Sequence, residues 1–481
     1  MTEIGTINDL DGIGEVHIVG IGGAGMSAIA RVLHGWGLVV HGSDRRSSPI
    51  TDALQAEGIR VTIGHAPDAI GSADLVLASS AVPDADPEIA AALERGVRVA
   101  RRPEFLAAMT AGYEVLAVAG AHGKTTVTGM LALALLEAGL DPTYIVGGVM
   151  SNLGTNAGAG AGAHFVIEAD EYRNTFLALA PRVAVVTNIE FDHPDCFPDM
   201  GFVRLSFGEF VGNIVPGGLL VACGDDAVAR SLAASHHAGG GRVVLYGTEQ
   251  TPETGYDLDW CAGNVRPNAQ GGVSFDVIHT GQVVGEVALQ IPGAFNAANA
   301  LAVLAVGSEI GLATEAVCSA LSRFQGTGRR FEVLGEVGGV TVIDDYAHHP
   351  TQIRGVLSAA RQRYGSRRIV AVWEPHTFSR IRALYDAFTM AFTAADKVVV
   401  LPVYAARERD DGRLTARDLA QAIVHPSVVN VDSLAEAVAH LVATSRPDDV
   451  VLLMGAGDEY LVGKRLIEAL SLQQVGEAEE Q

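Results

Sequence analysis

At 481 residues the chain is too long for one hydrophobic core, and its length predicts about three domains. Its 33 Lys and Arg residues against 56 Asp and Glu give a net charge of −23, which argues against nucleic acid and anionic membranes as partners. Hydrophobic residues make up 48% of the chain but lie in short runs, so no stretch of about 18 apolar residues could insert into a membrane.

The first part of the chain alternates β-rich runs with helical periodicity from Glu15 onward. Strands joined by crossover helices predict a parallel α/β sheet that is covered on both faces and binds ligands at the carboxyl ends of its strands. We expect this first domain to cover residues 1–110. Its β-rich runs are "VHIVG", "LVVHGSD", "RVTIGH" and "DLVLASSAV".

A glycine-rich loop follows the first predicted strand. Gly20, Gly22, Gly23 and Gly25 resemble a dinucleotide-binding fingerprint, and Asp44 lies about twenty residues further on as a possible ribose acceptor. The glycines could instead serve close helix–strand packing. A loop of this kind binds any pyrophosphate, so both NAD and a nucleotide-sugar diphosphate are possible ligands.

A second glycine loop opens the central part of the chain, in "VLAVAGAHGKTTVTG" from Val115 to Gly129. Its backbone N–H groups and the positive end of the following helix should converge on an anion. Lys124 would reach the β- and γ-phosphates of ATP, and the Thr125 hydroxyl would bind Mg²⁺. Val118 occupies the first glycine position of the usual motif. We expect Lys124 to be an exposed loop residue that can be replaced without loss of the fold.

Polar side chains follow the next two predicted strands, "HFVIEAD" and "RVAVVTNI". Because the ends of parallel strands face the ligand crevice, these groups could bind one or two Mg²⁺ ions, although imidazole is an unusual magnesium ligand and His193 could be a turn residue. The groups are Glu168, Asp170, Glu171, Asn188, Glu190, Asp192 and His193.

The rest of the central domain, which we expect to cover residues 111–326, first continues the α/β pattern. Alternating residues with glycine turns between Trp260 and Ile291 predict an antiparallel edge or flap, and a long helix follows to about Ile310. Asn296 and Asn299 share one face of that helix, where they could read an adenine edge or simply cap and bridge helices.

A third α/β series, expected over residues 327–481, begins with a hairpin in "FEVLGEVGGVTVIDDY". Arg329 and Arg330 precede it at the expected hinge, where they could clamp phosphate when domains close, or could be surface charges. The four cysteines are far apart and form no CxxC pair, which indicates reduced thiols and a cytoplasmic protein; they are Cys196, Cys223, Cys261 and Cys318.

Six motifs in this order resemble the Mur ligases of cell-wall precursor synthesis: GAHGKTT, EADE, TNIEFDHPD, NAANA, GRRFE and DDYAHHPT. The resemblance implies three α/β domains: an N-terminal Rossmann-like domain that binds UDP-sugar, a central P-loop ATPase-like domain, and a C-terminal Rossmann-like domain that brings the amino acid. It further implies that ATP and Mg²⁺ drive the joining of L-alanine to the lactyl carboxylate of UDP-N-acetylmuramate through an acyl phosphate.

The resemblance also assigns residues to each ligand. For the UDP-sugar they are Gly22, Gly23, Ala24, Gly25, Met26, Ser43, Asp44 and Ser80. For ATP they are Gly120, Ala121, His122, Gly123, Lys124, Thr125, Thr126, Asn296, Asn299, Arg330 and Asp345, the last near the ribose or the hinge. The metal ligands are Thr125, Glu168 and His193, and the amino-acid site holds Tyr346, His348, His376 and Arg380. Lys124, Arg330 and His348 are the catalytic candidates; His348 could act as a base or only orient the amine.

The chain departs from the family pattern at three positions. Thr377 stands where arginine is common and leaves more of the carboxylate binding to Arg380; Ala347 and Ala121 are tolerable replacements of glycine and threonine. Between His193 and Lys397 there is no lysine, so the carbamylated lysine of some family members has no candidate here, in agreement with the alanine-adding branch.

Three rival functions stay open on sequence alone. An NAD-dependent oxidoreductase would leave the Lys124 loop unexplained, and a nucleotide switch would need docking elements that the sequence lacks. The nearest rival is a recycling ligase that adds a whole tripeptide to the same sugar nucleotide; Tyr346 favours alanine only modestly. We expect a monomer or homodimer.

Overall fold

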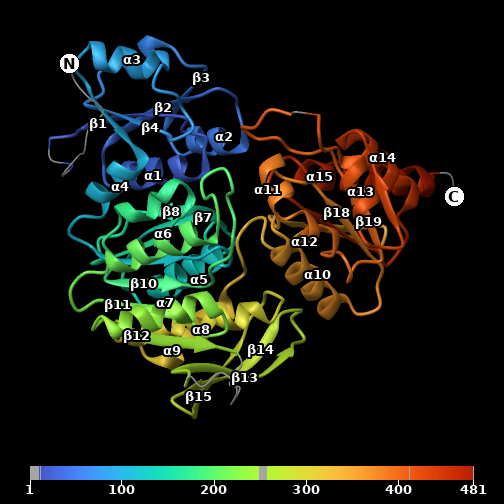
Figure 1. Cartoon of the computed structure of the whole chain (residues 1–481). Helices are drawn as coiled ribbons and strands as arrows, with labels where there is room; N and C mark the ends of the chain where they lie inside the picture. Colours follow the sequence, from blue (N-terminus) through green and yellow to red (C-terminus); the bar gives the residue numbers. More distant parts are fainter. Residues whose placement is uncertain (1–9, 11, 249–256, 411, 480–481) are drawn as a thin grey trace.

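The computed structural model describes residue 10 and residues 12–248, 257–410 and 412–479. The described chain forms three β-sheets in sequence order, each flanked by helices (Figure 1). The predicted three-domain α/β fold is therefore confirmed. Of the described helices, none is both long enough and apolar enough to span a membrane.

The N-terminal sheet has five parallel strands in the order β3-β2-β1-β4-β5. Its central strand β1 ends at Val19, and the glycine loop follows at the carboxyl edge between β2 and β4, where such sheets bind ligands. The strands are β1 (Glu15–Val19), β2 (Val39–Asp44), β3 (Arg60–Ile63), β4 (Leu75–Ala78) and β5 (Arg98–Arg101). The helices are α1 (Ala24–Gly35), α2 (Pro49–Ala56), η1 (Pro67–Ile70), α3 (Pro87–Glu94) and α4 (Arg102–Thr110).

The central sheet has ten strands in the order β15-β14-β13-β12-β11-β10-β6-β9-β7-β8. Its middle is parallel, whereas β13–β15 form the predicted antiparallel edge and β8 pairs antiparallel with β7. The strands are β6 (Glu114–Ala119), β7 (Thr143–Met150), β8 (Thr155–Gly158), β9 (His164–Glu168), β10 (Val183–Val186), β11 (Leu219–Cys223), β12 (Arg242–Gly247), β13 (Trp260–Pro267), β14 (Val273–His279) and β15 (Gln282–Ala288). The helices are α5 (Lys124–Glu137), η2 (Tyr172–Ala178), α6 (Met200–Gly212), α7 (Ala227–Ala238), α8 (Phe295–Glu309) and α9 (Thr314–Arg323).

Helix α5, which follows the second glycine loop, is buried on all sides. Every residue from Thr125 to Leu135 is buried, and the helix packs against α8 and α9. Its sequence is apolar all round, as expected for a helix inside a core rather than on a surface. The loop before it is therefore held by a rigid element on each side.

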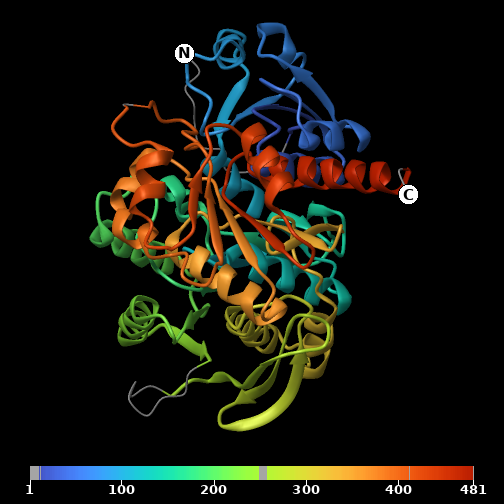
Figure 2. The same ribbon diagram turned by 90° about the vertical axis from the view of Figure 1, so that its right-hand side faces the viewer.

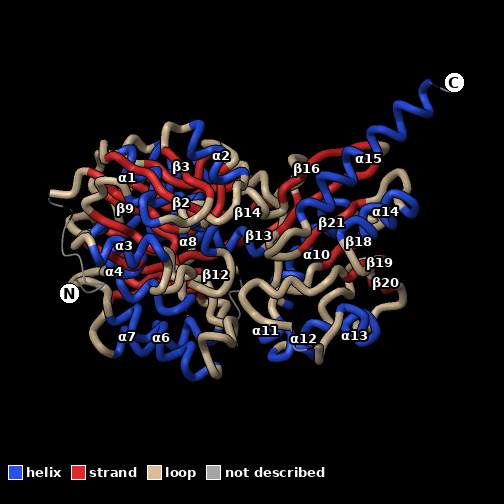
Figure 3. The backbone as a smooth tube through the Cα atoms, turned by 90° about the horizontal axis from the view of Figure 1, so that it is seen from above, coloured by secondary structure: helices blue, strands red, loops and turns tan. Residues whose placement is uncertain are grey.

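The C-terminal sheet has six strands in the order β16-β17-β21-β18-β19-β20 and is parallel except for the β16–β17 hairpin. Figure 2 shows helices on both of its faces, and Figure 3 shows the last helix running outward from the body. The strands are β16 (Glu332–Val337), β17 (Val340–Asp345), β18 (Ile369–Trp373), β19 (Lys397–Val400), β20 (Val428–Asn430) and β21 (Val450–Met454). The helices are α10 (Pro350–Tyr364), α11 (Phe378–Ala383), α12 (Tyr385–Thr389), α13 (Ala416–Ala422), α14 (Leu434–Thr444) and α15 (Tyr460–Glu479).

The apolar core clusters connect the three domains to different extents. One continuous core joins the N-terminal domain to one face of the central sheet, for example Ile29 of α1 with Ala157 of β8 and Phe165 of β9. The C-terminal sheet has separate cores on its two faces. Among the described residues, no core cluster extends from the central domain into the C-terminal one. The sheets change between β5 and β6 and between β15 and β16; the domain limits at 110 and 326 stay predictions.

Candidate active site

The second glycine loop lies between β6 and α5 and is fixed by the end of β10. Ala121 donates its N–H to the Asn188 carbonyl (3.0 Å), and His122 donates its N–H to Asn188 Oδ1 (2.8 Å). The Thr187 hydroxyl donates to the His122 carbonyl (2.5 Å). Gly123 precedes the helix in a left-handed conformation, at φ 84°. The first amide groups of α5 thus point out of the loop without helical partners, as an anion site requires.

Lys124 is not the exposed loop lysine that we expected from the sequence. Its side chain is only 12% exposed, and its Nζ lies 2.7 Å from Glu171 Oε2, whose side chain is 5% exposed. Burial alone would lower the pKa of Lys124, but Glu171, Asp170 and Glu168 outweigh it and raise that pKa. The lysine is therefore a buried cation that a carboxylate holds next to the loop.

Two of the three predicted metal ligands are in contact. The Thr125 hydroxyl lies 3.1 Å from Glu168 Oε1, and Gly147 N–H donates to Glu168 Oε2 (2.8 Å). Octahedral Mg²⁺ with bonds of about 2.1 Å places adjacent oxygens roughly 3.0 Å apart, so this pair fits two neighbouring corners. His193 lies across the same cavity, 3.7 Å from Glu171.

A cavity of about 260 Å³ adjoins the loop and is lined by eight of the eleven residues predicted for ATP. Asn299 Nδ2 donates to Asn296 Oδ1 (2.9 Å), so the two amides bridge each other and also line the cavity. Sequence reasoning missed the apolar walls, because aromatic and aliphatic residues carry no signal of their own in a core-rich chain. These walls are Ile291, Phe295, Phe331 and Val356.

The two arginines of the hinge have different places. Arg330 lines the cavity and reaches the Thr125 hydroxyl at 3.4 Å, whereas Arg329 pairs with Asp344 and Glu459 inside the C-terminal domain. Asp345 accepts backbone N–H bonds from residues 331 and 347, both at 2.8 Å, which fixes the hinge segment. Burial raises the pKa of Asp345 to about 6.

A larger cavity of about 410 Å³ lies on the other side of the loop, and it brings together residues of all three domains. It contains the predicted residues Ala24 and Gly25 of the UDP loop, Lys124, the three metal candidates and the whole amino-acid set. Five residues line both cavities and so form the wall between them: His122, Gly123, Thr125, Arg330 and Gln352.

Arg380, the predicted carboxylate clamp, is already paired across the domain interface. Its Nε donates to Asp192 Oδ1 (2.6 Å), and one terminal nitrogen donates to His376 Nδ1 (2.9 Å). Burial alone would raise the pKa of Asp192, but Arg380 and His193 hold it well below its usual value. The pair leaves a positive guanidinium edge at the cavity, and sequence reasoning did not foresee Asp192 as its partner.

His348 is held as a neutral imidazole. Its Nδ1 lies 2.8 Å from the Tyr346 carbonyl, which can only accept, so Nδ1 carries the proton. Nε2 is then unprotonated and lies 3.8 Å from Asp192 Oδ2, beside the cavity. Burial and the nearby Arg380 hold the pKa of His348 well below its ordinary value. The unprotonated Nε2 can accept a hydrogen bond at neutral pH.

The structure turns several predicted UDP-loop residues away from the cavity. The Ser43 hydroxyl is buried and donates to Glu88 Oε2 (2.5 Å), Met26 is part of the core, and Asp44 accepts the Gly22 N–H at 2.9 Å. The Ser80 carbonyl accepts from Arg173. Neither Gly22, Gly23 nor Gly120 is among the cavity-lining residues.

Arg102 is a cavity residue that sequence reasoning missed. A Cβ at Gly25 would lie 2.9 Å from its guanidinium carbon, so the glycine makes room for the arginine against the loop. Its Nε is buried without a hydrogen-bond partner, and its nearest carboxylate, Asp170, lies 3.7 Å away. A cation so placed between the two glycine loops suits an anionic ligand.

Comparisons with known proteins agree on one family. Three family models match in succession: the Mur ligase family, catalytic domain, over residues 15–114; the Mur ligase middle domain over residues 118–307; and the Mur ligase, glutamate ligase domain, over residues 329–457.

Two curated relatives are named UDP-N-acetylmuramate–L-alanine ligase. The protein of Kineococcus radiotolerans is 44% identical over 465 residues, covering 95% of this chain and 97% of the relative. That of Roseiflexus castenholzii is 41% identical over 478 residues, covering 97% and 98%.

Two similar solved structures are also Mur-type ligases by name. A UDP-N-acetylmuramate-alanine ligase from Thermotoga maritima has a TM-score of 0.79 at 29% identity and covers 95% of this chain and 99% of its own. A murein peptide ligase from Psychrobacter arcticus has a TM-score of 0.72 at 27% identity, with the same coverage.

Proposed function

The chain belongs to the Mur ligase family, and from that premise we propose that it joins L-alanine to the lactyl carboxylate of UDP-N-acetylmuramate at the expense of ATP, in peptidoglycan precursor synthesis. The observation that carries the proposal is the wall of five residues between two cavities. A nucleotide in one cavity and a carboxylate in the other could meet only at this wall. The terminal phosphate of the nucleotide, held by the nucleotide loop, would be the part that meets the carboxylate. An oxidoreductase would have no use for such a wall.

In the first step the carboxylate oxygen bonds to the γ-phosphorus of ATP, and the bond to the ADP oxygen breaks. The reactants are both anions, so the positive groups beside the loop reduce their repulsion. Lys124 and Arg330 supply that charge, and Lys124 leaves Glu171 to do so. Mg²⁺, when bound by Thr125 and Glu168, with His193 as a further candidate, neutralises phosphate charge.

In the second step the neutral amine of alanine attacks the acyl carbon, the C–O bond to phosphate breaks, and phosphate leaves with the proton that the nitrogen loses. Arg380 binds the alanine carboxylate with the guanidinium edge that Asp192 leaves free, next to His376. An α-amino group has a pKa near ~8, well above that of His348, so complete proton transfer to this imidazole is uphill. We therefore assign His348 the orienting role: its Nε2 accepts a hydrogen bond from the neutral amine, beside Tyr346.

The two cavities support the remaining ligand assignments. The adenine end of ATP occupies the smaller cavity, with Asn296 and Asn299 on one side. The diphosphate of the sugar nucleotide lies at Ala24 and Gly25, where Arg102 adds a positive charge. We propose a cytoplasmic enzyme, in keeping with four cysteines that are free thiols, acting as a monomer or homodimer.

The experiment measures the phosphate released from ATP in the presence of Mg²⁺, with each substrate omitted in turn. Mass spectrometry gives the mass of the product. We expect release only with both UDP-N-acetylmuramate and L-alanine, and a product heavier by one alanine residue. Faster turnover with the L-alanine-containing tripeptide would indicate the recycling ligase instead. Bound nicotinamide without ATP consumption would overturn the proposal.

A further inference from the structure

Gln352, in the first turn of α10, connects the amino-acid side of the site to the nucleotide loop. Its Oε1 lies 2.9 Å from the backbone nitrogen of His348 and 3.1 Å from that of His349. Its Nε2 lies 2.8 Å from Nδ1 of His122 in the nucleotide loop. His122 Nε2 lies in turn 3.0 Å from Glu190 Oε2.

The hydrogen-bond partners fix the direction of every bond in this chain of groups. Backbone N–H groups can only donate, so the Gln352 oxygen faces them and its NH₂ group donates to His122 Nδ1. The His122 proton must then be on Nε2, from which it donates to Glu190. His349 closes the arrangement: its Nε2 donates to the Phe191 carbonyl (3.3 Å).

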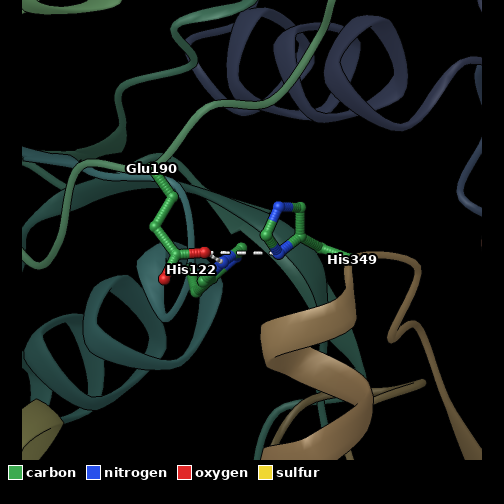
Figure 4. Close-up of side chains that lie close together, drawn as sticks. All are labelled: His122, Glu190 and His349. Carbon is green, nitrogen blue, oxygen red and sulfur yellow. Dashed lines mark hydrogen bonds and ion pairs between the residues drawn. The ribbon is translucent and has the colours of Figure 1, made fainter. Parts of the chain in front are cut away.

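Figure 4 shows His122, Glu190 and His349 converging, and their ligand atoms lie within 4.8 Å of one another, close enough for a metal ion. The hydrogen bonds argue against that use. A metal on His122 Nε2 would displace the proton given to Glu190, and Nδ1 would then face the NH₂ group of Gln352 with a proton of its own. Turning the amide would break its two bonds to backbone N–H groups. The cluster is better explained as a hydrogen-bonded connection.

This connection crosses an interface that no core cluster of the described residues spans. His122 and Glu190 belong to the central domain, and His349 and Gln352 to the C-terminal domain, whose core clusters are separate. The Thr351 hydroxyl adds a bond to Glu190 Oε1 at 3.2 Å. These bonds can exist only when the C-terminal domain is closed on the central one. Gln352 and His122 also both lie in the wall between the two cavities.

We propose that Gln352 is a positioning residue that couples seating of the amino-acid domain to the geometry of the nucleotide loop through His122. The inference rests on the proposed function, because it takes ATP and L-alanine as the two ligands. Closure aligns the segment that carries His348, and through Gln352 the same movement holds the side chain of His122. The loop backbone is fixed on its other side by Thr187 and Asn188, so His122 is then held from both domains.

The test is the effect of L-alanine on nucleotide affinity, measured by calorimetry with a non-hydrolysable β,γ-imido analogue of ATP and with UDP-N-acetylmuramate present. In the wild type we expect L-alanine to tighten analogue binding about fivefold or more, a typical coupling between sites. Gln352→Leu should reduce the factor to below about twofold, since leucine forms none of the three bonds. Gln362→Leu, the same change at an exposed position of α10, should keep the wild-type factor.

A second variant separates this role from helix capping, because Gln352 also completes a capping box with His349. Gln352→Glu retains the capping bonds, so its melting temperature without ligands should match the wild type. The introduced carboxylate cannot donate to His122 Nδ1, so Gln352→Glu should lose the coupling as Gln352→Leu does, to below about twofold.

The outcomes are distinct. Equal coupling in the wild type and in Gln352→Leu, or no coupling in an active wild type, would overturn the inference while leaving the proposed function intact. A wild type that makes no alanine-containing product would instead overturn the proposed function. Wild-type coupling in Gln352→Glu would show that the capping bonds alone are responsible and would also overturn the inference.

Discussion

At the scale of single residues, the Lys124–Glu171 pair changes what a loop mutation should do. Removing one partner of a buried ion pair leaves the other charge unpaired, which costs about 3–5 kcal/mol in typical proteins. Lys124→Met should therefore abolish phosphate release and also lower the free energy of unfolding by about 3–5 kcal/mol. Denaturant unfolding and a phosphate assay check the two effects separately.

Adding Glu171→Gln to the Lys124→Met protein provides the control. The double variant has no unpaired buried carboxylate, so most of the lost stability should return while activity stays absent. Stability equal to the wild type in the single variant would mean that Glu171 is protonated or hydrated when alone.

Arg380 allows a second comparison, because it is held by Asp192 across the domain interface. Arg380→Ala removes the proposed carboxylate clamp and should raise the KM for L-alanine by a factor on the order of 10 to 100 with a smaller change in kcat. Asp192→Asn keeps the guanidinium but loosens its orientation, so the increase should be smaller. Initial rates at saturating ATP and UDP-N-acetylmuramate measure both, and an unchanged KM in Arg380→Ala would move the carboxylate site elsewhere.

At the scale of elements, the nucleotide loop depends on a glycine with an unusual backbone. Gly120 has φ +141°, and a Cβ there would overlap the Thr187 hydroxyl and lie 3.1 Å from Asn188 N. Gly112 also has positive φ, at +83°, but a Cβ there would meet nothing within 4 Å. Gly112→Ala should cost only backbone strain of about 1 kcal/mol, whereas Gly120→Ala should cost several times that amount and abolish ATP turnover. Thermal unfolding of both variants tests the order; equal losses would mean that β10 moves to accommodate the methyl group.

The same scale shows which elements the sequence could predict. The apolar runs predicted β1, β4, β9 and β10 correctly, because strands that are buried on both faces consist almost entirely of apolar residues. The predictions missed β5, whose four residues "RVAR" have an arginine at each end, and the β7–β8 hairpin, whose glycines interrupt any alternation. Short edge strands and glycine-rich strands are stabilised by their neighbours, and that information is not local.

For the site as well, local features could be predicted from the sequence and long-range contacts could not. Motif residues such as Lys124, Glu168 and Arg330 could be predicted because each lies next to a strand end or a hinge. Their partners could not: Gln352 contacts a residue 230 positions away, and Arg380 pairs with a carboxylate 188 positions away. Such contacts arise only when the C-terminal domain folds back on the central one.

At the scale of the whole molecule, the three domains are joined in two ways. The N-terminal and central domains share an apolar core, so they should move as one body. The C-terminal domain is attached by a hinge and by polar contacts, including those of Arg330, Gln352 and Arg380. Polar contacts exchange readily with water, so this interface is the one that can open to admit substrates.

Titratable groups within the C-terminal domain should respond to acid in opposite directions. In the C-terminal domain, burial raises the pKa of Asp344 to about 7 and that of Asp345 to about 6. As the pH falls, both carboxyls therefore take up protons in the folded state before they do so in the unfolded chain. As the pH falls below those values, this proton uptake increases the stability of the folded domain. It opposes the buried histidines of the same domain, such as His376, whose pKa burial and Arg380 lower to about 4.

In the N-terminal domain the pH dependence of stability is simpler. His41 is buried against His17, with their Nδ1 atoms 2.9 Å apart, and burial followed by His17 lowers its pKa to about 4. Between that value and the unfolded pKa of about 6.5, the unfolded chain holds the extra proton, so stability is full above 6.5 and falls as the pH drops toward 4. At pH 5 the loss should be about 2 kcal/mol from this residue.

Hydrogen exchange of the β1 and β2 amides at pH 7 and pH 5, corrected for the intrinsic exchange rate, measures this loss within the domain concerned. His41→Asn removes the titrating ring, so its opening free energy should change by about 2 kcal/mol less than that of the wild type between the two pH values. His34→Asn, at an exposed position of α1, should keep the wild-type dependence. An equal pH dependence in His41→Asn would mean that the proton taken up on opening belongs to another group, and the His17–His41 contact would then not be what limits the domain in acid.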